Sequence, residues 1–146
     1  MEAAPKILKA GEGLRLNVIG DLQCVKLSSQ DTNGQFTLIE QLDAPGVGVP
    51  KHVHTHEDEV FQVLEGTVEY QLEDAVHVLR AGDVAYMPRG TAHSFKIVGD
   101  TPARVLLSIF PAGLEKMFEE LDRLPAGPPD FAVVTAICTR YGIRFV

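Results

Sequence analysis

The chain contains 146 residues, the length of one domain that buries its own core. Twenty acidic and thirteen basic side chains give a formal charge of −7, which argues against a nucleic-acid partner because such a partner requires a basic surface. No apolar run approaches the roughly 20 residues of a membrane span, and residues 1–10 lack the apolar core of a secretory signal. We therefore expect a cytoplasmic protein with no membrane partner.

The two cysteines, Cys24 and Cys138, lie far apart and form no C-x-x-C motif. A single disulfide between them is one alternative. The other is that each is a small buried apolar residue, which is a common role for free cysteine. We expect two reduced thiols, in keeping with a cytoplasmic location.

Short apolar segments separated by turn signals follow a loose arm over residues 1–10. In chain order, the expected strands lie at about 14–18, 24–28, 36–39, 60–64, 68–72, 76–80, 84–87, 93–98 and 104–110. The turns between them carry pairs such as Asn33-Gly34 and Gly82-Asp83, which favour tight reversals. About nine or ten short strands at even spacing predict an all-β sandwich or closed barrel rather than a βαβ fold.

The tail of the chain has a different periodicity. Residues 114–124 carry apolar side chains at the helical spacing of ~3.6 residues, which predicts a helix. The stretch from Pro125 to Pro129 breaks it, and a second helix is expected from about Asp130 to Tyr141, with Gly142 at its end. These helices cover one mouth of the barrel, pack on a partner, or pack on the outer wall of the same barrel.

Three histidines alternate at positions 52, 54 and 56, just before an acidic segment. Residues two apart on a strand point to the same face, so His52 and His54 present their imidazoles side by side. Glu59 has the opposite parity and joins them only if the chain bends before it. Two histidines and one carboxylate suit Fe(II) and also accept Mn, Ni, Co or Zn. His56 is an alternative ligand, but we expect it at the bend, beside the ligands or facing solvent.

A second segment supplies a further ligand candidate. His93 follows a Pro88-Arg89-Gly90 turn and begins an expected strand. The spacing G-x5-H-x-H-x4-E-x6-G is met by Gly46, His52, His54, Glu59 and Gly66. The spacing G-x5-P-x-G-x2-H is met by Gly82, Pro88, Gly90 and His93. Both motifs, in this order and with a short segment between them, resemble those of the cupin superfamily.

The resemblance implies an all-β double-stranded β-helix, or jelly roll, with one or two C-terminal helices. It implies a single domain over residues 1–146, with a barrel at about 14–110 and a helical tail at about 111–146. It also implies one divalent transition metal (Fe, Ni, Mn, Co or Zn) held by His52, His54, Glu59 and His93. Because small cupins often pair through their sheets, the expected assembly is a homodimer.

One position departs from the family pattern: Ile97 stands where the second motif commonly has asparagine. Ile97 shares the parity of His93 and Phe95, so we expect an apolar wall beside the metal. The side chains expected to fill the core or line a pocket are Phe36, Leu38, Phe61, Val63, Tyr86, Met87, Phe95, Ile97 and Phe110. Of Tyr86 and Met87, one is expected to face the cavity. Glu57 and Asp58 are expected in a solvated loop, and His77 on an exposed strand face.

Within the cupins, the segment from His54 to Gly66 resembles small quercetin-dioxygenase-like members. This resemblance implies a metal-dependent dioxygenase that acts on a small aromatic or enolic compound, such as a flavonol. Glu59 then stays on the metal or takes the substrate's hydroxyl proton as a general base. The alternatives are a non-catalytic small-molecule-binding cupin and a metal-assisted isomerase or cyclase, because one scaffold hosts many chemistries.

Overall fold

The structure is a computed structural model that describes residues 2–146. Met1, the first residue of the expected arm, lies outside the described residues. The strands of the barrel are β1 (Leu14–Val18), β2 (Asp21–Leu27), β3 (Thr37–Asp43), β4 (Gly48–His54), β5 (Asp58–Glu65), β6 (Thr67–Leu72), β7 (Ala75–Arg80), β8 (Val84–Met87), β9 (His93–Val98) and β10 (Ala103–Phe110). The tail contains α1 (Glu115–Asp122), α2 (Phe131–Arg140) and β11 (Ile143–Phe145).

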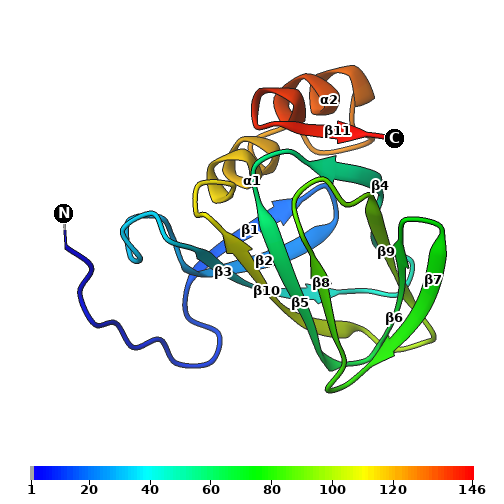
Figure 1. Ribbon diagram of the computed structural model, residues 1–146, viewed down its shortest axis with the longest axis horizontal. Coiled ribbons are helices and arrows are strands. Elements are labelled where there is room, and N and C mark those ends of the chain that lie inside the picture. The colour runs from blue at the N-terminus through cyan, green and yellow to red at the C-terminus, as the bar shows by residue number, and fades with distance from the viewer. Residues whose placement is uncertain (1) are drawn as a thin grey trace.

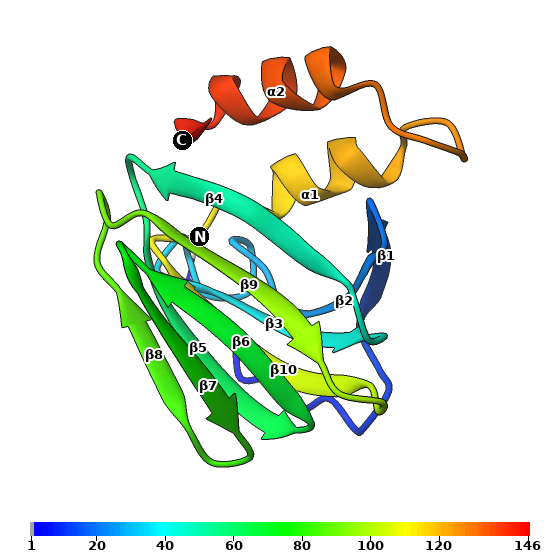
Figure 2. The ribbon, with the colours of Figure 1, turned by 90° about the vertical axis from the view of Figure 1, so that its right-hand side faces the viewer.

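The strands form two antiparallel sheets that face each other (Figures 1 and 2). One sheet has the order β1-β2-β3-β10-β5-β8, and the other has the order β11-β4-β9-β6-β7. Sequence neighbours β4 and β5 lie in different sheets, as do β8 and β9, so the chain crosses repeatedly between the sheets. This is the double-stranded β-helix, and the predicted all-β fold with C-terminal helices is confirmed.

The core follows directly from the period of two along each strand. On β10, Ala103, Val105, Leu107 and Ile109 are buried, and the residues between them are more exposed. On β5, the inward positions are Glu59, Phe61 and Val63. An inward carboxylate in an otherwise apolar row marks this end of the barrel as chemically distinct, because a buried charge requires a partner.

Gly66 turns the chain from β5 into β6 and explains the last glycine of the first motif. Its φ of +86° is in the left-handed region, which favours glycine. A Cβ at this position would lie 2.7 Å from the Cα of Ala103. The glycine is therefore required both by its backbone conformation and by the close approach of β10.

The tail lies over one open end of the barrel (Figure 2). Helix α2 begins at a cap in which the Asp130 carboxylate accepts a hydrogen bond from the backbone N–H of Ala132 at 3.0 Å. After Gly142 the chain forms β11, which pairs with β4 and places Ile143 opposite His54. The two helices match the expected segments, whereas β11 was not predicted. Of the positions expected for the tail, the structure shows the one over the mouth of the barrel, where tail residues line the cavity.

Other expectations concern the two cysteines, a membrane span, the N-terminal arm, the assembly and the location. Cys24 and Cys138 are both free thiols. Within residues 2–146, no helix is long and apolar enough to cross a membrane. Residues 2–10 of the arm contain no helix or strand, and the Ile7 side chain is 84% exposed. The homodimer and the cytoplasmic location stay predictions.

Glu115, the first residue of α1, joins three segments of the chain. Its buried carboxylate accepts hydrogen bonds from the Ser29 N–H at 2.7 Å, the Thr37 hydroxyl at 2.7 Å and the Gly113 N–H at 2.8 Å. Burial raises the pKa of Glu115, but these hydrogen bonds outweigh it, and the pKa lies below its ordinary value. The carboxylate thus stabilises the fold above its ordinary pKa, and this contribution is lost as pH falls through the folded value.

We predict that Glu115→Ala destabilises the protein by about 2–3 kcal/mol at neutral pH, because it leaves buried donors without an acceptor. Urea unfolding measures the effect. The partly exposed Glu119, on the same helix, is the matched control, and Glu119→Ala is expected to stay within about 0.5 kcal/mol of the parent. The difference between the Glu115 variant and the parent should shrink in acid. An equal loss in both variants would contradict this assignment.

Candidate metal centre

Four side chains from three strands meet at the covered end of the barrel. His52 and His54 are the alternate residues at the end of β4, and His93 is the first residue of β9, directly opposite His52 in the register. Glu59 comes from β5 in the facing sheet. Between β4 and β5 the chain bends at Thr55 and His56, and this bend corrects the parity of Glu59.

The donor atoms of these side chains lie very close together. His52 Nε2 is 3.1 Å from His54 Nε2, and the carboxylate oxygens of Glu59 lie 3.3 Å from His54 Nε2 and 3.2 Å from His93 Nε2. The ligand atoms of the three histidines all fall within 4.8 Å of one another. All four residues are at most 7% exposed. The four ligands expected from the motifs are thus adjacent and share one space.

The hydrogen bonds on the far side of two rings determine which nitrogens face this space. His52 Nδ1 lies 2.8 Å from the Pro50 carbonyl, and His93 Nδ1 lies 2.9 Å from the Thr91 carbonyl. A carbonyl only accepts, so in the neutral rings each Nδ1 carries the hydrogen and each Nε2 presents a lone pair. Two such lone pairs and the Glu59 carboxylate converge in a buried space, an arrangement that requires a cation. The donor set therefore fits a divalent transition metal.

The electrostatics of the site agree with this reading. Burial, and secondarily the neighbouring His93 and His54, lower the pKa of His52 to about 4, so the ring stays neutral. Burial raises the pKa of Glu59, but the neighbouring His54 and His93 outweigh it and lower the pKa overall. A metal requires neutral imidazole and ionised carboxylate, and these shifts favour both forms.

Glu57 departs from expectation. It is only 6% exposed rather than part of a solvated loop, because the bend turns its side chain back toward β4. Its Oε1 lies 3.9 Å from His54 Nδ1, and within residues 2–146 neither atom has a hydrogen-bond partner. A carboxylate behind a ligand histidine orients the ring and raises its basicity. Asp58, by contrast, is half-buried and pairs with the exposed Arg89 at 3.0 Å.

The other histidines stand apart from the donor set. His56 is exposed at the bend, where its ring packs against Gly142, and a Cβ on that glycine would lie 2.6 Å from His56 Cδ2. The expected position of His56 at the bend is therefore observed. His77 is exposed on β7, as predicted.

A cavity of about 300 Å³ opens beside the four side chains. Phe61, Tyr70 and Phe95 form part of its wall inside the barrel. The ring of Tyr70 stacks on that of His93 with centroids 6.2 Å apart, and its hydroxyl donates to the Met87 sulfur at 3.2 Å. The tail supplies the opposite wall, through Met117, Phe118, Leu121, Phe131, Val134, Cys138, Ile143 and Phe145. The metal candidates thus adjoin a mostly apolar chamber that the tail partly covers.

The predicted pocket residues fall into three groups. Phe61 and Phe95 line the cavity. Val63, Met87 and Ile97 are at most 1% exposed and fill the core, and among residues 2–146 none of the three lines the cavity. Ile97 therefore packs in the apolar core, and the apolar wall expected beside the metal stays a prediction. For Phe36, Leu38, Tyr86 and Phe110, the pocket prediction is wrong.

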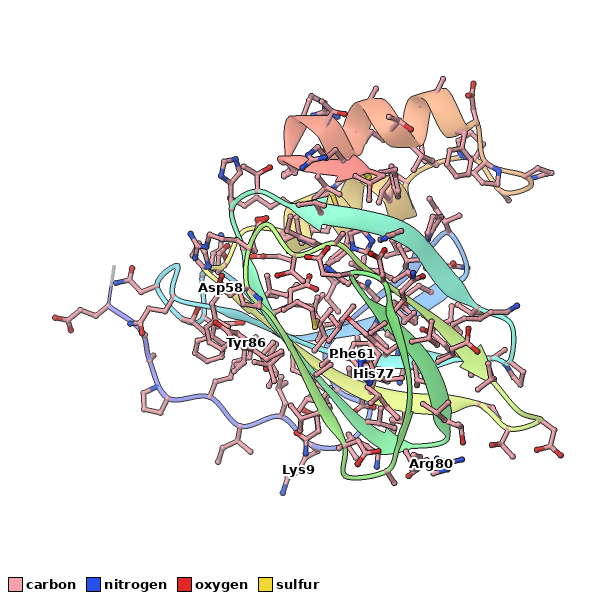
Figure 3. The ribbon with its side chains drawn as sticks, turned by 45° about the vertical axis from the view of Figure 1, so that its right-hand side comes forward. Lys9, Asp58, Phe61, His77, Arg80 and Tyr86 are labelled. Carbon is pink, nitrogen blue, oxygen red and sulfur yellow. The ribbon has the colours of Figure 1, made fainter. Side chains whose placement is uncertain are left out.

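The reason for the error is parity. Tyr86 is 57% exposed beside the fully buried Met87, and Figure 3 shows it directed away from the barrel while Phe61 points inward. Leu38 alternates with the buried Thr37 and Ile39 and therefore faces outward. The rings of Phe36 and Phe110 contact each other instead, at a centroid distance of 5.8 Å, and Phe110 is 39% exposed.

Sequence reasoning also missed one part of the cavity wall. Asp21, Gln23 and Gln41 line it, although each is at most 6% exposed. The signal was available in β2, where Asp21 and Gln23 share the parity of the buried Val25. Polar residues at inward positions of a strand indicate a functional or hydrogen-bonded interior.

Comparison with known proteins agrees with the fold. The cupin domain model matches residues 39–110. The chain is 28% identical over 116 residues to quercetin 2,3-dioxygenase of Bacillus subtilis, an alignment covering 80% of this chain and 34% of that protein. It is 31% identical over 111 residues to an uncharacterized protein of Aquifex aeolicus, an alignment covering 73% of this chain and 85% of that protein.

Among solved structures, KdgF from Halomonas sp. superposes with a TM-score of 0.68 at 18% identity, covering 76% of this chain and 99% of that one. A fold of this kind, with both sequence motifs meeting at a buried histidine cluster, defines a small barrel protein whose interior carries residues that could hold a metal ion. The chain belongs to the cupin superfamily. It spans only about a third of the Bacillus enzyme.

We predict that the purified protein contains close to one divalent transition metal per chain, and that His54→Ala/His93→Ala removes it. The double variant deletes two of the converging donors. Elemental analysis measures the metal, and His77→Ala, at an exposed histidine, is the control that keeps it. A parent protein that holds no metal after reconstitution and dialysis would contradict the assignment.

We also predict that Glu57→Gln lowers metal affinity by about 10–100-fold, because it removes the charge behind His54 Nδ1. Competition with a chelator of known affinity measures the change. The matched control is Asp58→Asn, which alters the neighbouring carboxylate that faces Arg89 instead. Equal affinities for the Glu57 variant and the parent would show that Glu57 has no part in orienting His54.

Proposed function

We propose that this cupin is a metal-dependent oxygenase that acts on a small aromatic or enolic compound. The observation that carries the proposal is the meeting of His52, His54, His93 and Glu59 at the wall of a mostly apolar cavity that the tail partly covers. The similarity to a quercetin 2,3-dioxygenase supports the same reaction class. The ligand partner is therefore a small molecule that enters the barrel.

Each part of the cavity has a task in such a reaction. The three histidines and Glu59 would hold the metal, which supplies Lewis acidity toward an enolate or phenolate oxygen when bound. Phe61, Tyr70 and Phe95 offer flat apolar faces against which an aromatic ring packs. The tail keeps bulk water out, which protects reactive intermediates from hydrolysis.

Glu59 is the residue best suited to move a proton. Its carboxylate is buried, and its pKa is lowered by His54 and His93 despite its burial, so it is an ionised acceptor at neutral pH. A substrate hydroxyl that approaches the histidines comes within reach of the same carboxylate. Glu59 then accepts the hydroxyl proton as a general base, and the substrate anion stays beside the donor set.

We predict that the metal-loaded protein consumes oxygen with at least one member of a panel of flavonols, catechols and β-diketones. Glu59→Gln is expected to lower turnover by about 10²–10⁴-fold, because it removes the base, while metal content falls less than in the histidine double variant. An oxygen electrode and elemental analysis on the same samples measure both quantities. His77→Ala is the control expected to keep both.

Two outcomes separate this proposal from the alternatives. No oxygen uptake by fully metallated protein with any member of the panel would contradict the oxygenase. Tight binding of a panel compound without turnover would favour a non-catalytic binding cupin. Conversion to an isomeric product without oxygen consumption would favour a metal-assisted isomerase or cyclase on the same site.

A further inference from the structure

A second polar group lines the cavity in addition to the metal candidates. Asp21 and Gln23 on β2, and Gln41 on β3, point inward from the six-stranded sheet. Gln23 and Gln41 are direct neighbours in the register, and both are at most 3% exposed. Their surroundings are otherwise apolar, with Val18, Ile19 and Leu121 in the same wall.

The hydrogen bonds of this group leave acceptors without donors. The side-chain amides of Gln23 and Gln41 both donate to Asp21 Oδ2, at 2.9 and 2.8 Å. This fixes the orientation of both amides, because exchanging nitrogen and oxygen would place two acceptors face to face. Within residues 2–146, the oxygens Gln23 Oε1, Gln41 Oε1 and Asp21 Oδ1 have no hydrogen-bond partner.

Asp43 accounts for one of these three acceptors. Burial, together with the charge of Asp21, raises the pKa of Asp43 to about 8, so that carboxyl carries a proton at neutral pH and shares it with Asp21. No comparable donor faces the two glutamine oxygens among the described residues. A buried acceptor without a donor is costly, so two of them on a cavity wall indicate a ligand that supplies the hydrogens.

The register gives the separation between the two polar regions. Glu59 pairs with Ile109, whereas Gln41 pairs with Val105 on the same strand β10. Gln41 therefore lies two strands and four residues from Glu59, on the order of 15 Å along the sheet. A ligand held at the histidines by one edge reaches the glutamines only through a second ring or ring system.

We propose that Gln23 and Gln41 form a specificity subsite that accepts hydrogen bonds from hydroxyl groups on the distal ring of the ligand. An ammonium group is the less suitable donor, because the apolar walls would not repay its dehydration. The inference rests on the proposed function for the aromatic class of the ligand, and it adds that this ligand is hydroxylated at the end remote from the metal candidates.

The test compares two probes that share the same hydroxyketone edge. Quercetin carries additional ring hydroxyls, and 3-hydroxyflavone lacks them. Binding to the purified protein is measured anaerobically by fluorescence titration, so that turnover does not interfere. We expect the affinity for quercetin to exceed that for 3-hydroxyflavone by about tenfold or more, because one good hydrogen bond to a buried acceptor is worth about a factor of ten.

The matched variants are Gln41→Met and Gln23→Met, which keep the side-chain length and remove the acceptor. Each is expected to reduce the preference for quercetin to about twofold or less, measured as the ratio of the two affinities in the same variant, because the loss of the amide donor to Asp21 affects both probes alike. Gln62→Met is the control, because Gln62 lies on β5 between the buried Phe61 and Val63 and so faces outward. It should keep the full preference.

Equal affinity of the parent for both probes would overturn the subsite, and so would a preference that survives both glutamine variants. Binding of neither probe would also overturn it, and the glutamine oxygens would then be satisfied by ordered water alone. A preference without oxygen uptake leaves the subsite in place and removes only the oxygenase. The binding measurement thus tests the subsite, and the oxygen-uptake measurement separately tests the oxygenase.

Discussion

The structure depends on one constraint: several buried electron-pair donors point at the same small space. His52 and His93 are held from behind by backbone carbonyls, and Glu59 faces them from the opposite sheet. Placing such a set inside a barrel is unfavourable unless a cation joins it. Burial alone would lower the pKa of His54, but Glu59 and Glu57 outweigh it and raise the pKa above its ordinary value, which reflects the negative charge gathered around this ring.

Much of the fold around that constraint was predictable because it repeats simple local rules. The period of two along the strands identified the barrel, and the period of 3.6 identified both tail helices. The alternation of His52 and His54 placed them on one face, and the observed bend at Thr55 and His56 supplies the parity change that Glu59 requires. His93 was assigned only through the resemblance, because its position opposite His52 depends on strand order, which no local pattern specifies.

The errors have equally definite causes. Leu38 and Tyr86 were assigned to the pocket by residue type, although a one-residue difference in parity places a side chain on the opposite face of the sheet. Glu57 was assigned to solvent because it is charged, but the bend buries it. Strand β11 has only three residues, too few to show an alternation, and its pairing with β4 depends on the tail first crossing the barrel mouth.

The covered mouth bears on the polar residues at two places in an apolar chamber, the histidines with Glu59 at one and Gln23 with Gln41 at the other. If the tail packed elsewhere, water would satisfy the oxygens of Gln23 and Gln41 at little cost. With α1, α2 and β11 over the opening, the polar atoms on the wall depend more on partners inside the protein, on ordered water or on a ligand. The chamber therefore selects for shape through its aromatic walls and for polarity at its two ends. A compound that satisfies only one end leaves the polar atoms at the other end without partners. The resulting discrimination between compounds is larger than extra apolar contact alone would provide.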